Sequence, residues 1–193
     1  AVDDFLKNNP NEHKFVAGVL GPTNRPCSMS PDVNDPGFRN INFDNLFNDY
    51  KNCISALVKA KVDIILVETV FDTLNSKAAL SAIKNVEQSN NVKIPIMISA
   101  TITDLSGRTL SGQTVEGFYN SIIHSNPLSV GLNCALGPKE LEPYLIELNR
   151  ISEVYTSIHP NAGLPNAFGG YDETPDSIAK FAKEWSDSNY INI

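Results

Sequence analysis

Short apolar runs alternate with segments of helical periodicity along the chain, and this alternation constrains the fold more than any other feature. Each run is bounded by turn-forming residues and is typical of a buried strand. The segments between the runs repeat apolar residues at the helical period, which predicts helices that bury one face. The expected strands cover residues 15–20, 63–67, 94–99, 128–132, 154–158 and 190–193, and the expected helices cover 2–7, 43–59, 73–87, 114–123, 138–148 and 174–185.

Strands that alternate with helices predict βα units joined into a parallel sheet. Connections after strands are long and rich in Gly, Pro and Asn, whereas those after helices are short. Because βα barrels carry their active sites at the carboxyl ends of the strands, this asymmetry predicts a functional face there. Neither a glycine-rich dinucleotide fingerprint nor a phosphate-loop lysine motif is present, which weakens the case for a nucleotide-binding sheet. We expect a single α/β domain, 1–193, and favour a barrel over an open doubly wound sheet.

Charge and composition exclude several classes of partner. The chain has 193 residues and a net charge of −7, which argues against binding to a phosphate backbone. The sequence has no run of about 18 apolar residues and no signal-peptide pattern, so it predicts neither a membrane span nor secretion. Three cysteines are too few, and odd in number, for a disulfide framework. We expect a cytoplasmic protein with no nucleic acid or membrane partner.

Cys134 lies where an expected strand meets an expected helix. The apolar run 128–132 delivers Asn133 and Cys134 to its carboxyl end, and Gly137 and Pro138 then suit a tight turn and a first helical position. Backbone N–H groups at such a junction favour a thiolate, which is the form of cysteine that binds metal. Cys134 is therefore a candidate zinc ligand. The alternative is a small buried hydrophobe, which describes most free cysteines.

Other polar residues follow expected strands and should share one face. Glu68 directly ends an apolar run and, if buried, needs a cationic partner, either a substrate ammonium group or an internal arginine such as Arg108. Asp72 either belongs to this face or is a solvated cap for the next helix. Cys53 lies beside the apolar face of its helix and is expected in the core. The remaining candidates on this face are Asn24, Thr101 to Thr103, Asn133, His159 and Asn161.

Five segments carry a resemblance to a known family, and they occur in the family's order across nearly the whole chain. They are Gly18 to Asn24, Glu68 to Thr73, Ser106 to Gln113, Gly131 to Pro138 and His159 to Asn166. Together they resemble the homocysteine-binding module of cobalamin-dependent methionine synthase. Betaine-dependent homocysteine methyltransferases share the fold but contain fewer of these sequence segments.

The resemblance implies a zinc-containing, TIM-type (βα)₈ barrel. Such a module activates homocysteine for methyl transfer from methylcobalamin, and methyltetrahydrofolate recharges this cofactor on other modules of the same polypeptide. In that family Cys134 matches the first zinc thiolate, and Glu68 matches an acidic residue that binds the substrate amino group. Asn161 lies where a polar residue faces metal and substrate, and we expect Asn133 to contact the substrate as well.

The sequence departs from the family pattern in what it omits. The other two zinc thiolates come from an adjacent cysteine pair, which we expect beyond Ile193, and the first two barrel strands have no counterpart. Cys27 and Cys53 do not match ligand positions. We therefore expect an incomplete barrel of about six βα units, an internal fragment that is inactive alone. The alternatives are a homocysteine methyltransferase with a betaine or S-methylmethionine donor, a non-catalytic folded fragment, and a metal-free barrel lyase with Glu68 as base.

Overall fold

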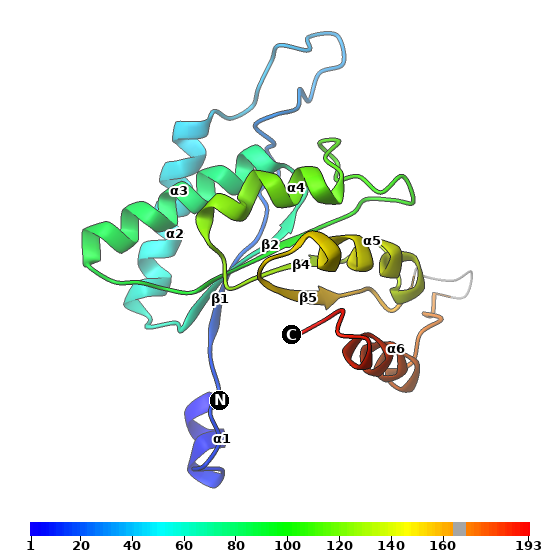
Figure 1. The fold of residues 1–193 in the computed structure, drawn as a ribbon. Helices are drawn as coiled ribbons and strands as arrows, with labels where there is room; N and C mark the ends of the chain where they lie inside the picture. Colours follow the sequence, from blue (N-terminus) through cyan, green and yellow to red (C-terminus); the bar gives the residue numbers. More distant parts are fainter. Residues whose placement is uncertain (164–168) are drawn as a thin grey trace.

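The computed structural model describes residues 1–163 and 169–193, which form an α/β fold around a parallel sheet (Figure 1). The strands are β1 (Ala17–Leu20), β2 (Ile64–Val70), β3 (Ile96–Ala100), β4 (Ser129–Asn133) and β5 (Tyr155–His159). The helices are α1 (Val2–Asn8), α2 (Phe43–Lys59), α3 (Thr73–Asn90), α4 (Val115–Ile122), the 3-10 helix η1 (Ile123–Ser125), α5 (Pro138–Ile151) and α6 (Pro175–Asp187). Among the described residues, no helix combines the length and the apolar character needed to cross a membrane.

The sheet has the order β1-β2-β3-β4-β5, and every pair of neighbours is parallel. An added Cβ on Gly18 of β1 would contact Leu57 of α2, so residues in register with Gly18 point toward the helices. Because side chains alternate along a strand, the residues between them point to the opposite side, which we call the inner face. The inner face carries Leu66 and Glu68 of β2, Met97 and Ser99 of β3, Ser129, Gly131 and Asn133 of β4, and Tyr155, Ser157 and His159 of β5.

The helices α2 to α5 follow one another along the other side of the sheet, each packed against the next (Figure 1). Their apolar faces meet the strands in one continuous core. Burial of a large aliphatic side chain contributes about 1.5–3 kcal/mol, so this layer is the main source of stability. Fully buried members include Leu46, Ile83, Phe118 and Leu145 from helices and Ile65, Ile98, Val130 and Leu132 from strands.

The expected strand at residues 190–193 is wrong, although this segment does lie beside β5. The backbone N–H groups of Asn192 and Ile193 both donate to the Thr156 carbonyl, at 2.9 and 3.2 Å. In return, the Thr156 N–H donates to the side-chain Oδ1 of Asn192 at 3.0 Å. Because a side chain replaces the backbone carbonyl that a ladder needs, the segment binds the edge of β5 without forming a strand.

The expectation that Cys53 belongs to the core is also wrong, because its side chain is exposed on α2. The buried residues of α2 are Leu46, Tyr50 and Ile54. Residues four apart lie on one side of a helix, so these three form a buried stripe. Cys53 lies beside this stripe, outside it.

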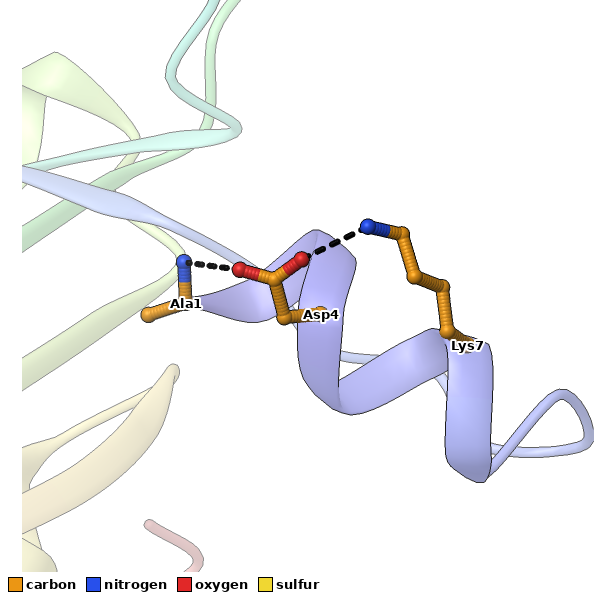
Figure 2. Close-up of polar contacts among 3 residues, drawn as sticks. All are labelled: Ala1, Asp4 and Lys7. Atoms are coloured by element: carbon orange, nitrogen blue, oxygen red, sulfur yellow. Dashed lines mark hydrogen bonds and ion pairs between the residues drawn. The ribbon is translucent and has the colours of Figure 1, made fainter.

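The first helix, α1, stands apart from the sheet and buries no side chain (Figure 1). Its Asp4 carboxylate lies between two cations, at 2.7 Å from Lys7 Nζ and 3.8 Å from the Ala1 amino group (Figure 2). These groups are exposed, and ion pairs of this kind add little to stability.

Candidate functional site

The carboxyl ends of β2 and β4 are joined to each other although β3 lies between them. Strands two apart in a flat sheet are separated by about 9–10 Å. Here the Asn133 side chain at the end of β4 forms hydrogen bonds to Thr69 of β2 and accepts one from Ser99 of β3. We call Thr69, Ser99, Asn133 and Cys134 the Asn133 cluster. It connects three strands at the end of the sheet where the sequence predicts a functional face.

The Asn133 amide makes two hydrogen bonds through each of its polar atoms. Oδ1 accepts from the Thr69 N–H at 3.1 Å and from the Ser99 hydroxyl at 2.6 Å. Nδ2 donates to Thr69 Oγ1 at 2.8 Å and to Cys134 Sγ at 2.9 Å. The Asn133 side chain is 4% exposed, and protein groups already bind both its amide oxygen and its amide nitrogen. A direct contact between Asn133 and a substrate stays a prediction.

Cys134 lies in a tight turn immediately after β4. Its φ is +60°, and that of Ala135 is also +60°. Each such non-glycine residue costs of order 1–3 kcal/mol and persists only where its surroundings hold it. Here the Cys134 N–H donates to the His159 carbonyl at 3.0 Å, and the Leu136 N–H donates to the Cys134 carbonyl at 2.7 Å. The turn leaves Cys134 partly exposed beside Asn133, so the sulfur is not a buried core group.

The segment after β5 lies against the same turn. The Asn161 N–H donates to the Leu136 carbonyl at 3.0 Å. His159 ends β5 in register with Asn133, and its side chain is exposed. The predicted residues Asn161 and Cys134 therefore belong to adjacent turns. Residues 164–166, which complete the motif after His159, lie outside the described part of the chain.

Glu68 lies within β2, whereas the sequence predicted it just after the strand. The strand continues to Val70 through an irregularity, and Thr69 in this stretch has a φ of +56°. Glu68 is partly buried and forms no ion pair within residues 1–163 and 169–193. Arg108 instead donates to the Gly112 carbonyl at 2.8 Å, inside its own loop. An unpaired, half-buried carboxylate on the predicted functional face suits a cationic group of a ligand.

A small hollow of about 10 Å³, enough for about one water molecule, opens to solvent beside Glu68 at the carboxyl ends of β1 and β2. Glu68 and Thr69 contribute to its wall, together with Gly21 and Tyr50. The Tyr50 hydroxyl donates to the Gly21 carbonyl at 3.2 Å, which ties α2 to the loop after β1. The hollow is therefore of water size rather than of small-molecule size.

The described residues supply one ligand that fits zinc, Cys134, but not a complete set of ligands. No three His, Cys, Asp or Glu side chains in residues 1–163 and 169–193 lie together as a metal site. Cys134 offers a sulfur donor of the kind that zinc accepts, and Asn133 donates an N–H to it, as groups that support a metal thiolate do. Cys27 is buried in the loop after β1, where burial and then the Asp72 carboxylate raise the pKa of its thiol.

Asp72 caps α3 and is not part of the Asn133 cluster. Its Oδ1 accepts from the Leu74 N–H at 2.9 Å, and its Oδ2 accepts from the Ser28 N–H at 3.0 Å. The capping role is confirmed, but the carboxylate is buried rather than solvated, with 2% of its surface exposed. Asn75 of the same helix accepts from the Cys27 N–H at 2.8 Å, so the start of α3 anchors the loop after β1.

Three other candidates are not joined to the cluster by any hydrogen bond between described residues. Asn24 is exposed in the loop after β1. The Thr101 hydroxyl is buried and has no hydrogen-bond partner among residues 1–163 and 169–193. The Thr103 N–H donates to the Arg108 carbonyl at 2.9 Å.

The sequence reasoning missed Thr69 and Ser99, which supply half of the Asn133 cluster. A polar residue within the apolar run at 94–99 was a usable signal for Ser99. Thr69 gave no such signal, because β-branched residues rarely adopt the left-handed backbone conformation that it has here.

Solved structures with similar folds include a homocysteine methyltransferase. The chain superposes on the apo form of homocysteine methyltransferase MmuM from Escherichia coli with a TM-score of 0.67 and 16% identity. The superposition covers 94% of this chain and 67% of that protein. The metallated form gives a TM-score of 0.67 and 17% identity over 95% of this chain and 66% of that one. At this identity the likeness concerns the fold, which is that of a TIM-type enzyme of which this chain spans about two thirds.

The match at the level of the family covers the whole sequence. A family model described as homocysteine S-methyltransferase matches residues 1–193. The chain therefore belongs to the homocysteine S-methyltransferase family.

Proposed function

We propose that this chain is part of a methionine synthase in which zinc-activated homocysteine accepts a methyl group from methylcobalamin. The observation that carries the proposal is the hydrogen-bonded connection from the Glu68–Thr69 stretch through Asn133 to the sulfur of Cys134. This connection joins the residue that follows Glu68 to a sulfur donor at one end of the inner face. Family membership supports homocysteine as the methyl acceptor, and the five sequence segments support the cobalamin-dependent branch.

Each site residue has a separate task in this proposal. Glu68, which forms no ion pair with any described residue, binds the ammonium group of homocysteine. Cys134 is one zinc thiolate, and Asn161 presents a polar side chain to metal and substrate from the next turn. Two more cysteine ligands come from residues that follow Ile193 in the parent polypeptide. A zinc ion bound there supplies a thiolate at neutral pH by lowering the pKa of the substrate thiol.

The parent protein also completes the barrel in this proposal. Additional βα units close a (βα)₈ barrel at the free edge of β1 and beyond residues 190–193. Other modules of the same polypeptide bind folate and cobalamin. The 193-residue chain does not turn over homocysteine alone, because it holds one thiolate of three.

The metal assignment is tested in the intact protein with two single variants. Cys134→Ala should lose zinc and methionine formation together, since it removes a ligand. Cys53→Ala is the matched control, because its thiol is exposed on α2, and it should retain both. Normal zinc content in Cys134→Ala would refute the assignment. Metal analysis of the 193-residue chain then separates a competent site from an inert fragment.

The methyl donor needs its own assay, because family membership leaves a betaine or S-methylmethionine donor equally consistent. Each donor is supplied separately to the intact protein with homocysteine. Methionine formed only from methylcobalamin supports the proposed branch. If methionine forms from betaine or S-methylmethionine but not from methylcobalamin, the proposed cobalamin-dependent branch is wrong.

A further inference from the structure

The orientation of the Asn133 amide is determined by the groups around it. The Thr69 N–H can only donate, so the amide atom that faces it at 3.1 Å must be the oxygen. The Ser99 hydroxyl donates to the same oxygen at 2.6 Å and strengthens this choice. The NH₂ group is therefore directed at Thr69 Oγ1 and at Cys134 Sγ.

We propose that Ser99 is a positioning residue that acts through Asn133 to hold the sulfur of Cys134 in place for the metal. Ser99 does not touch the sulfur. Its hydroxyl shares with Thr69 the task of holding the amide of Asn133, and the amide donates an N–H to Cys134 at 2.9 Å. This inference rests on the proposed role of Cys134 as a zinc ligand.

The backbone around the sulfur shows why such support is needed. Cys134 and Ala135 both have left-handed φ values, so the turn that carries the thiol is strained. Two backbone hydrogen bonds hold the turn itself, to His159 and within the turn from Leu136. The hydrogen bond from Asn133 is the one that reaches the sulfur atom among the described residues.

The sheet offers a matched control for Ser99. Ser129 lies on the inner face of the adjacent strand, and it is also a buried serine, with 0% exposure against 2% for Ser99. Its hydroxyl has no hydrogen-bond partner in the described structure. A change to alanine removes a buried hydroxyl in both cases, but only Ser99→Ala removes a hydrogen bond to Asn133.

The test measures zinc affinity of the intact protein by competition with a chelator. Loss of a group that supports a metal ligand typically weakens binding by roughly tenfold to a hundredfold, so we expect a loss in that range for Ser99→Ala. Ser129→Ala should stay within about twofold of wild type, and Ser99→Thr, which keeps the hydroxyl, should restore affinity. Thermal unfolding of each variant confirms that it is folded. Equal affinities for Ser99→Ala and Ser129→Ala would overturn the proposal.

A double-mutant cycle tests whether Ser99 acts through Asn133. Once Asn133→Ala has removed the amide, Ser99→Ala should cause no further loss of zinc affinity. An equal loss in both backgrounds would show an independent effect and overturn the proposal. These outcomes differ from failure of the proposed function, in which wild type binds no zinc or Cys134→Ala binds it normally.

Discussion

Gly131→Ala should destabilise the sheet because β4 and β5 are too close at this point for a side chain. Gly131 lies in register with Ser157 on the inner face, two residues before Asn133. A Cβ built on Gly131 would clash first with the Ser157 hydroxyl, and it would also lie 2.5 Å from the Ser157 carbonyl oxygen and 3.1 Å from its carbonyl carbon. The two carbonyl atoms belong to the backbone of a paired strand, so they cannot move aside as the hydroxyl of a side chain can.

The expected magnitude follows from this contact. Overpacking of a tight interior costs typically 1–3 kcal/mol, and a clash with backbone belongs at the upper end, about 3 kcal/mol. For a domain of this size each kcal/mol lowers Tm by about 2–4 °C, so Tm should fall by about 6–12 °C. Differential scanning calorimetry of the 193-residue chain measures this change.

Two further variants make the Gly131 experiment decisive. Gly21→Ala is the control, because an added Cβ there meets no atom within 4 Å, and its effect should be within about 0.5 kcal/mol. Gly131→Ala combined with Ser157→Ala should remain unstable, because the clashing carbonyl belongs to the backbone. A decrease in Tm of less than about 2 °C for Gly131→Ala, or a wild-type Tm in the double variant, would refute the reasoning.

Three other predictions concern the loop after β1, its anchors and the cysteines. Asp72→Ala should lower the free energy of unfolding by about 2 kcal/mol in urea denaturation, because it removes a helix cap and a second buried acceptor. Iodoacetamide at pH 8 should label Cys53 and Cys134 before Cys27, since Cys27 is buried and burial raises the pKa of its thiol. Burial raises the pKa of Tyr50 to about 12, so its ultraviolet titration should be delayed, and the stability that Tyr50 contributes should be lost as pH rises from about 10 to about 12.

Each of these predictions has a contrary outcome. Asp104→Ala is the control for the cap, because Asp104 is exposed and accepts only within its own loop, and equal effects of the two substitutions would contradict the capping argument. Labelling of Cys27 as fast as Cys53 in the folded chain would show that the loop is open. A tyrosine titration with no component above the ordinary range would show that Tyr50 is not buried.

Much of the fold could be predicted from the sequence, because local patterns decide it. The apolar runs became β1 to β5 with ends shifted by at most three residues, since hydrogen bonding to neighbouring strands, rather than hydrophobicity, sets where a strand begins and ends. Residues 190–193 show the limit of this approach. Their apolar pattern suits a strand, but the Asn192 side chain takes the place of a backbone acceptor.

The site was predicted in part, for a different physical reason. Parallel strands place their carboxyl ends at one edge, so Glu68, Asn133, Cys134 and Asn161 could be assigned to one face from their positions alone. The contacts among them depend on sheet curvature and on the left-handed conformation of Thr69, which the sequence does not encode locally. The same curvature explains why Asn133, expected to contact the substrate, has its amide occupied by protein groups.

X-ray absorption at the zinc edge of the intact protein tests the central claim most directly. Sulfur ligands of zinc lie at about 2.3 Å, so the sulfur shell can be counted. If Cys134 is a ligand held by Asn133, Cys134→Ala should lose zinc or show one sulfur fewer than wild type. A Cys134→Ala protein with full zinc content and an unchanged sulfur shell would contradict the account.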